Sequence, residues 1–177
     1  LDSAEIQHML MAISGTDTIP LVRIPSSNPV FIQRALDMGA LGIVVPLVKT
    51  ADEARAIVSA TRFPPQGTRS FGPLRAAHYG IDNADYLERA NDNIIVALIL
   101  ETREAAENLE AIASVPGVDA LYLGPFDLCL SLGLNPMQQP FPQIEAIMKE
   151  MVAAAQKHGF AAGFGVGAVD LGKQCRD

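Results

Sequence analysis

Five short runs of apolar residues recur along this chain, and most of the segments between them have the periodicity of amphipathic helices. A continuous apolar run is typical of a strand that is buried on both faces, as strands of parallel sheets are. Alternation of such strands with helices predicts repeated βα units. The predicted strands cover residues 20–24, 41–45, 94–100, 120–123 and 161–166.

Several helix boundaries carry sequence signals. Asn28-Pro29 predicts a helix start with proline at the first helical position, and Gly39 predicts the end of that helix. Thr50 followed by Glu53 predicts a capping box at the start of the next helix. The predicted helices cover residues 3–13, 29–38, 51–61, 103–113 and 143–158. The proline- and glycine-rich residues 63–86 are predicted to form a long loop with room for a short helix.

This order of elements favours a (β/α)8 barrel of the TIM type. No Gly-x-Gly-x-x-Gly motif follows the first predicted strand, which disfavours a dinucleotide-binding fold. A complete barrel usually takes about 200 residues or more, and five strands in 177 residues are too few. We therefore expect residues 1–177 to form one α/β barrel domain seen incompletely, with about five of the eight βα units and with strands missing at both ends.

Composition excludes several classes of function. A net charge of −7 argues against a nucleic-acid binder. The sequence predicts neither a membrane-spanning helix nor a signal peptide, because no apolar stretch is long enough and no basic start precedes one. The two cysteines, Cys129 and Cys175, have no metal-binding or redox spacing. They are expected to be reduced thiols of a cytoplasmic protein.

Polar side chains follow three of the predicted strands, at the carboxyl ends where a parallel barrel has its active site. These side chains are Arg23, Glu101 and Asp127. Two carboxylates, completed by water and substrate oxygens, commonly hold Mg²⁺. Simpler interpretations exist: a helix-dipole acid for Glu101, a helix N-cap for Asp127 and an ion-pairing or surface role for Arg23. The joint position of the three favours a site.

Long stretches of the chain resemble the HpcH/HpaI aldolase family. The resemblance runs from about residue 1 to 167 and includes PLVRIPSSNP, ALGIVVPLVKTADEARAIVSATRFPPQGTRSFGP, DYLERAN and LETREAAENLEAIASVPGVDALYLGPFDL. It implies a (β/α)8 barrel that assembles as a hexamer by exchange of a C-terminal helix. It also implies a metal-dependent class II aldolase that acts on pyruvate-derived 2-oxo acids.

The resemblance implies roles for the strand-end residues. Glu101 and Asp127 match the ligands of a divalent ion, typically Mg²⁺, Mn²⁺ or Co²⁺, which the 2-oxo acid chelates through its keto and carboxylate oxygens. Arg23 matches the arginine that contacts the keto oxygen, which becomes the enolate oxygen. Stabilisation of that developing charge is the largest contribution such a site can make.

The resemblance places the substrate carboxylate at the start of the next helix. Gly124 and Pro125 form the turn there, and the backbone N–H groups of Phe126 and Asp127 match the donors to the carboxylate. A helix N-terminus is suited to this task. In the long loop, Arg69 is the expected further substrate contact, and the alternative is a loop that packs against neighbouring subunits.

Three departures from the family pattern bear on the reaction. Family members use an Asp and a Glu-His pair as acid and base, from a strand that would precede these residues. Ile99 stands where many aldolases of the family have glutamine. Leu47 stands where a decarboxylating branch, typified by macrophomate synthase, has histidine, which favours the aldolase branch.

The expected activity is that of a metal-dependent lyase that cleaves or forms a C–C bond next to a pyruvate enolate, on a 4-hydroxy-2-oxo acid. Three alternatives remain open: an oxaloacetate decarboxylase or macrophomate-synthase-like enzyme, a CoA-ester lyase of the malyl or citramalyl type, and a degenerate barrel with a binding role. The CoA-ester lyase is disfavoured, because Arg69 and Arg75 are isolated and form no basic run for the phosphates of CoA.

Overall fold

The computed structural model describes residues 2–138 and 141–165. Five parallel strands form one sheet and lie side by side in chain order. The strands are β1 (Leu21–Arg23), β2 (Gly42–Val45), β3 (Ile95–Leu100), β4 (Ala120–Leu123) and β5 (Ala161–Phe164). All five predicted strands are confirmed, although Val166, at the predicted end of the last, lies outside the described residues, as does Cys175.

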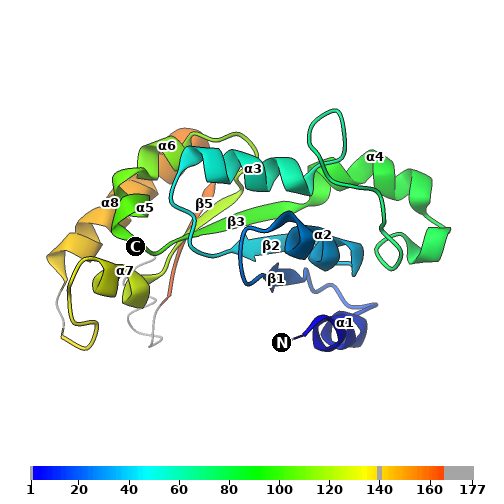
Figure 1. Ribbon diagram of the computed structural model, residues 1–177, viewed down its shortest axis with the longest axis horizontal. Helices are drawn as coiled ribbons and strands as arrows, with labels where there is room; N and C mark the ends of the chain where they lie inside the picture. The colour runs from blue at the N-terminus through cyan, green and yellow to red at the C-terminus, as the bar shows by residue number, and fades with distance from the viewer. Residues whose placement is uncertain (1, 139–140, 166–177) are drawn as a thin grey trace.

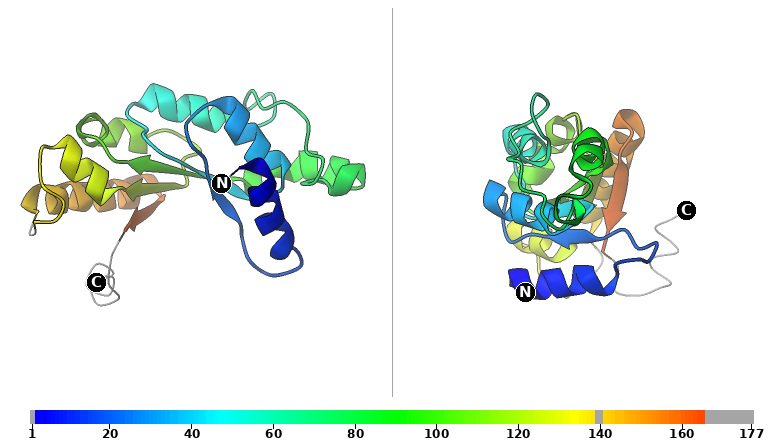
Figure 2. Two further views of the ribbon diagram at one scale, coloured as in Figure 1. Left: turned by 60° about the horizontal axis from the view of Figure 1, so that its bottom comes forward. Right: turned by 90° about the vertical axis from the view of Figure 1, so that its right-hand side faces the viewer.

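The helices lie between the strands in the alternation that the sequence predicts, and they cover one side of a curved sheet (Figure 1). α1 (Ser3–Ala12) is set apart from the others, beside β1 at the edge of the sheet (Figure 2). No helix in the described part of the chain is long and apolar enough to cross a bilayer. The remaining helices are α2 (Pro29–Asp37), α3 (Ala51–Thr61), α4 (Asn83–Asn93), α5 (Arg103–Glu107), α6 (Leu109–Ala113), α7 (Pro125–Ser131) and α8 (Pro142–His158), with a 3₁₀ turn η1 (His78–Gly80).

The two faces of the sheet have different environments. Successive side chains of a strand point to opposite faces. On β3, Val96, Leu98 and Leu100 face the helices, and each is at most 1% exposed. The opposite side of β3 carries Ala97 and Ile99, and we call this side of the sheet the inner face, because it points towards the axis in a closed barrel. By the same alternation, Glu101 continues the inner face beyond the end of β3.

The predicted helix signals are present at the expected positions. The Thr50 side chain accepts a hydrogen bond from the Glu53 N–H, and the Glu53 carboxylate accepts one from the Thr50 N–H. Asn28 caps α2 with its side chain. Gly39 follows α2 with φ +101°, a conformation that a Cβ disfavours. Local chemistry therefore sets the start and end of these helices.

The helix predicted over residues 103–113 is interrupted. α5 ends and α6 begins at Asn108, which has φ −99° and ψ 10°. The Asn108 side-chain amide donates a hydrogen bond to the Lys49 carbonyl, in the loop after β2, at 2.9 Å. At this break, the Asn108 side chain therefore connects the α5–α6 segment to the loop after β2.

The predicted loop 63–86 is shorter than expected, because α4 begins at Asn83. The α4 sequence is polar and only Ala90 is buried, so it lacks the apolar periodicity that indicates a helix. Asn91 holds α4 against the segment after α3. Its side chain accepts a hydrogen bond from the Phe63 N–H at 2.7 Å and donates one to the Phe63 carbonyl at 3.1 Å.

Candidate active site

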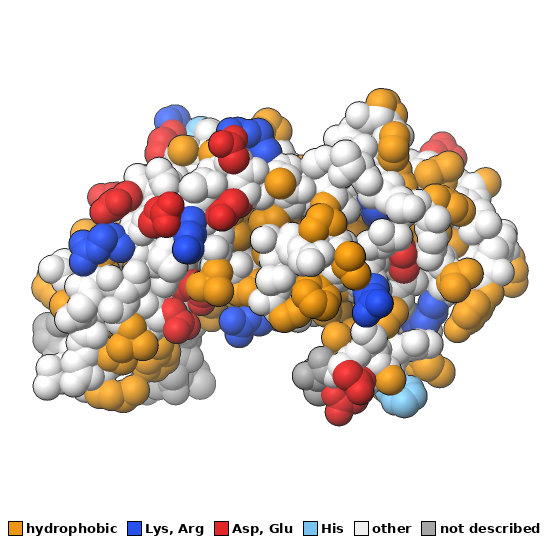
Figure 3. Space-filling view, in the orientation of Figure 1, with side chains coloured by type: hydrophobic (Ala, Val, Ile, Leu, Met, Phe, Trp, Pro, Cys, Tyr) orange, Lys and Arg blue, Asp and Glu red, His pale blue; other side chains and the backbone are white. Residues whose placement is uncertain are grey.

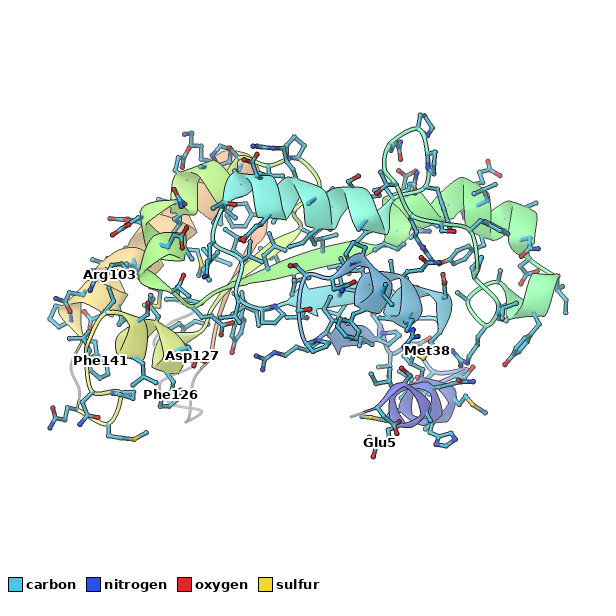
Figure 4. The ribbon with its side chains drawn as sticks, in the orientation of Figure 1. Glu5, Met38, Arg103, Phe126, Asp127 and Phe141 are labelled. Carbon is cyan, nitrogen blue, oxygen red and sulfur yellow. The ribbon has the colours of Figure 1, made fainter. Side chains whose placement is uncertain are left out.

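The three residues predicted for the site all lie at the carboxyl ends of their strands. Arg23 is the last residue of β1, Glu101 directly follows β3, and Asp127 lies in the first turn of α7, just after β4. Because the strands are parallel, these positions share one edge of the sheet. Figure 4 shows Asp127 at this edge and Met38, at the end of α2, far from it on the other side of the molecule.

Glu101 is a buried acid, 4% exposed. Its Oε1 accepts a hydrogen bond from the Leu47 N–H at 2.8 Å. Across residues 2–138 and 141–165, Oε2 accepts no hydrogen bond and the carboxylate has no cationic partner. A buried carboxylate normally requires an opposite charge or several donors, so this one has unused capacity to bind a cation.

The Leu47 backbone is in the left-handed region, with φ +58°. A non-glycine residue adopts this conformation at a cost of about 1–2 kcal/mol. The Leu47 N–H meets Glu101 Oε1 in this conformation. This contact cannot be predicted from the sequence, because no sequence signal marks a leucine for positive φ.

Gly124 allows α7 to begin directly against Glu101. A Cβ on Gly124 would lie 2.8 Å from Glu101 Cβ and 3.0 Å from Glu101 Oε2, too close for any side chain. The Gly124 N–H donates to the Leu100 carbonyl at 3.0 Å, which ties the turn to the end of β3. The first turn of α7 is therefore held beside the buried carboxylate.

Asp127 is not the N-cap of α7, and that interpretation of its role is corrected. The N-cap is Gly124, which has no side chain to close the helix end. Within the described chain, the Phe126 and Asp127 N–H groups donate no hydrogen bond, and the exposed Asp127 carboxylate has no partner. The α7 start thus presents two free N–H groups and one free carboxylate.

The far end of α7 is fixed to α5. The Ser131 hydroxyl accepts a hydrogen bond from the Arg103 N–H at 2.8 Å, and the Arg103 guanidinium donates to the Leu132 carbonyl at 3.2 Å. Figure 4 shows Arg103, Phe126 and Asp127 at the same end of the molecule. Arg103 begins α5, the helix that follows Glu101, and its hydrogen bonds go to the end of α7, the helix that bears Asp127. These bonds therefore fix the position of α7 relative to the segment of Glu101.

Arg23 reaches the same edge from β1. It pairs in register with Val44, and Val44 pairs with Ala97, so Arg23 lies on the inner face and is exposed. In the described residues, Arg23 makes no hydrogen bond or ion pair with Glu101 or Asp127. The structure thus places the three side chains at one edge and joins none of them directly.

The two carboxylates fit a magnesium-type site. Mg²⁺ prefers oxygen ligands, keeps several waters and needs only one or two protein carboxylates. Oε2 of Glu101 and the carboxylate of Asp127 have no protein partner among the described residues, and they lie on adjacent segments. Cys129, also in α7, does not suit a thiolate ligand, because burial raises the pKa of its thiol and keeps it protonated.

Arg69 is not at the carboxyl ends of the strands, where the site is predicted, and its predicted substrate contact is corrected. Its side chain is fully buried, and Nη2 donates to Asp37 Oδ1 at 2.8 Å and to the Tyr86 hydroxyl at 2.9 Å. The guanidinium lies 4.5 Å from the centroid of the Phe63 ring. Asp37 ends α2, the helix that leads into β2, so Arg69 lies at the amino ends of the strands.

A cavity of about 860 Å³ lies between α1 and the edge of the sheet. Apolar side chains of α1, β1 and α2 line most of it, together with Arg23. Neither Glu101 nor Asp127 contributes to its walls. The strand-end carboxylates therefore lie outside this cavity, which Arg23 borders. Figure 3 shows the lower side of the molecule hollowed between its two ends.

Comparison with known proteins supports this interpretation of the fold. The chain matches the HpcH/HpaI aldolase/citrate lyase family over residues 2–176. It is 41% identical over 175 residues to a 2-dehydro-3,6-dideoxy-6-sulfogluconate aldolase of Pseudomonas putida. That alignment covers 97% of this chain and 67% of the relative. It is 36% identical over 174 residues to a 2-keto-3-deoxy-L-rhamnonate aldolase of Escherichia coli O1:K1 / APEC. That alignment covers 97% of this chain and 64% of the relative.

Solved structures give the same result. An HpcH/HpaI aldolase/citrate lyase family protein of Burkholderia cenocepacia J2315 superposes with a TM-score of 0.92 at 36% identity, over 99% of this chain and 70% of that chain. Macrophomate synthase is also a structural neighbour, with a TM-score of 0.84 at 27% identity, over 99% of this chain and 63% of that chain.

The parallel sheet, its helices and these neighbours define an α/β protein of the TIM-barrel class, with the barrel incomplete, as predicted. The chain belongs to the HpcH/HpaI aldolase/citrate lyase family, which confirms the resemblance seen in the sequence. It spans about two thirds of the length of the curated relatives it matches.

Proposed function

We propose that this protein is a divalent-metal-dependent carbon–carbon lyase, an aldolase that acts on a 4-hydroxy-2-oxo acid by way of a pyruvate enolate. The observation that carries the proposal is the buried Glu101 carboxylate, which has no cationic partner among the described residues and lies against the α7 turn that bears Asp127. Both curated relatives are named as aldolases of 2-oxo-3-deoxy sugar acids, which supports this substrate class.

Glu101 and Asp127 are the residues that would hold the metal. Mg²⁺ suits two carboxylates best, with Mn²⁺ or Co²⁺ as alternatives. When bound, the metal supplies Lewis-acid polarisation of the substrate keto group. The Leu47 N–H fixes Oε1 of Glu101, which leaves Oε2 for this role.

Arg23 and the α7 turn are proposed to hold the substrate. Cleavage of the bond between C3 and C4 of a 4-hydroxy-2-oxo acid leaves its electron pair on the pyruvate fragment, and the charge spreads to the keto oxygen. The Arg23 guanidinium would stabilise that charge. The free Phe126 and Asp127 N–H groups would bind the carboxylate and hold the acid in one orientation.

The 4-hydroxyl must lose a proton as the aldehyde forms. A guanidinium such as that of Arg23 has no acceptor atom, and Glu101 and Asp127 are assigned to the metal, so another group or a water must accept this proton. A homo-oligomer, with a hexamer as the specific expectation, and a cytoplasmic location also stay predictions.

The proposal is tested by pyruvate release from a 2-keto-3-deoxy sugar acid and from oxaloacetate, and by acetyl-CoA release from malyl-CoA, each with added Mg²⁺ and with EDTA. We expect turnover of the sugar acid that EDTA abolishes and Mg²⁺ restores. Faster turnover of oxaloacetate would instead identify a decarboxylase, and malyl-CoA turnover a CoA-ester lyase. Full turnover in EDTA would contradict a metal-dependent reaction, and no turnover of any substrate would favour the binding role.

A further inference from the structure

Tyr122 is a phenol without a hydrogen-bond partner in the described residues, close to the proposed substrate site. It lies on the inner face in β4, in register with Ile99 of β3 and Gly163 of β5. Its side chain is 37% exposed, and within residues 2–138 and 141–165 its hydroxyl makes no hydrogen bond. The hydroxyl is therefore available as a donor on the face where Glu101 continues the line of Ile99.

The ring of Tyr122 runs along β5 towards the carboxyl end of the sheet. A Cβ on Gly163, its register partner, would lie 3.0 Å from Tyr122 Cδ2. A Cβ on Gly165, two residues further, would lie 2.5 Å from the Tyr122 hydroxyl oxygen and 3.9 Å from Pro125 Cδ. The phenol thus lies against Gly163 and Gly165, and its hydroxyl and Pro125, the first residue of α7, both border the space above Gly165.

The start of α7 has few donors of its own. Pro125, its first residue, has no N–H, and Gly124 has no side chain that could contribute. In the part of the chain that the structure describes, Phe126 and Asp127 have two N–H groups without an acceptor, whereas a carboxylate has room for about four hydrogen bonds. A phenol hydroxyl beside Pro125 is a neutral donor that adds to these two.

We propose that the Tyr122 hydroxyl donates a hydrogen bond to the carboxylate of the bound 2-oxo acid, as a third donor beside the Phe126 and Asp127 amides. This inference rests on the proposed function and adds a substrate-binding residue to it. Tyr122 then contributes to binding of the acid more than to the bond-breaking step, since the carboxylate is charged before and after cleavage.

The test removes only the hydroxyl. Protein loaded with Mg²⁺ is titrated with pyruvate by calorimetry, and exchange of the pyruvate C3 protons with D₂O is followed by NMR. We expect Tyr122→Phe to weaken pyruvate binding roughly tenfold, because the bond is to a charged acceptor, while the exchange rate at saturating pyruvate stays within about threefold. Tyr79→Phe, at a 72% exposed position in η1, is the matched control and keeps wild-type affinity.

A second variant tests the geometry. Gly165→Ala places a methyl group 2.5 Å from the hydroxyl oxygen and must displace it. We expect it to weaken pyruvate binding about as much as Tyr122→Phe does, and to add little in the Tyr122→Phe background, because the pair acts through one contact.

The outcomes separate the two proposals. If Tyr122→Phe binds pyruvate as the wild type does while both proteins exchange its protons, the inference about Tyr122 is overturned and the proposed function stands. The inference about Tyr122 is also overturned if Gly165→Ala weakens pyruvate binding equally in the wild-type and the Tyr122→Phe proteins. If the wild-type protein neither binds pyruvate nor exchanges its protons, both proposals are overturned.

Discussion

Two buried charges lie at opposite ends of the sheet, and their surroundings differ. Arg69 is 3% exposed and Glu101 is 4% exposed. Arg69 is ion-paired with Asp37, hydrogen-bonded to Tyr86 and placed over the Phe63 ring. In the described residues, Glu101 receives one backbone hydrogen bond and faces no cation. Both side chains are almost fully buried, but only Arg69 has a counter-charge among residues 2–138 and 141–165.

The difference indicates that Arg69 has a structural role and Glu101 a chemical one. A buried charge with its counter-charge and aromatic neighbours holds segments together, and Arg69 joins the end of α2 to the start of α4. A buried charge without a counter-charge is costly unless something outside the chain neutralises it. The structure keeps Glu101 in that state with a left-handed Leu47 and a glycine at 124. We infer that the missing charge is the metal.

The largest expected effect follows neutralisation of Glu101. Glu101→Gln keeps the side-chain shape and the hydrogen bond from Leu47, but it removes the charge. We expect Mg²⁺ affinity and turnover to fall on the order of a hundredfold or more, measured by calorimetry and by pyruvate release. Glu104→Gln, at an exposed acid of α5, is the matched control and is expected to change neither. Equal Mg²⁺ affinity in the two variants would contradict the assignment of Glu101 as a metal ligand.

Arg69 is expected to respond in stability and not in metal binding. Arg69→Met leaves Asp37, which is 19% exposed, without its cation and should destabilise the fold by about 3 kcal/mol in urea denaturation. Mg²⁺ affinity should be unchanged. Arg89→Met removes an exposed ion pair with Asp85 and should cost less than about 0.5 kcal/mol. A large loss of Mg²⁺ affinity in Arg69→Met would show that the two ends are coupled.

Gly124 tests the close contact between α7 and Glu101. Gly124→Ala places a Cβ 2.8 Å from Glu101 Cβ, so the helix start or the carboxylate must move. We expect about 1–3 kcal/mol of destabilisation and a roughly tenfold loss of Mg²⁺ affinity. Gly133→Ala, which has open space but φ +78°, should lose stability while its Mg²⁺ affinity is kept. A loss of affinity in both variants would trace the effect to stability alone.

The smallest effect is expected at Glu110, a charge that the chain neutralises at the surface. Hydrogen bonds from Lys157 and then His158 lower the pKa of its carboxyl. Its contribution is therefore present above the unfolded-state pKa and is lost as the pH falls through the lower folded-state value. Glu110→Gln should slightly flatten the acid side of a stability–pH curve measured by urea denaturation. Glu107→Gln should leave the curve unchanged, and an equal change in both variants would contradict the assignment.

Much of the fold can be predicted from the sequence, because its signals are local. The apolar runs predict all five strands, and the Thr50–Glu53 pair predicts a capping box that is present. α4 escapes prediction because long-range hydrogen bonds from Asn91, and not apolar periodicity, hold it in place. The break at Asn108 is not predicted for the same reason, because its side-chain amide donates to the distant Lys49 carbonyl.

The candidate site can be predicted only in part. Position after a strand identifies Arg23, Glu101 and Asp127, since a parallel sheet brings its carboxyl ends together. The same rule fails for Arg69, because a loop residue has no fixed place relative to the strands and its partner Asp37 lies 32 positions away. The positive φ of Leu47 and the path of the Tyr122 ring over β5 depend on tertiary packing, which the sequence pattern does not express.

The central claim is that Glu101 and Asp127 together hold a divalent ion to which a 2-oxo acid binds. A crystal structure of the protein with Mn²⁺ and oxamate, recorded to show anomalous scattering from manganese, tests it most directly. The account predicts one strong peak within about 2.0–2.4 Å of a carboxylate oxygen of each residue, with the oxamate carboxylate at the Phe126 and Asp127 N–H groups. A peak elsewhere, or a Glu101 carboxylate that contacts no metal in the loaded crystal, would contradict it.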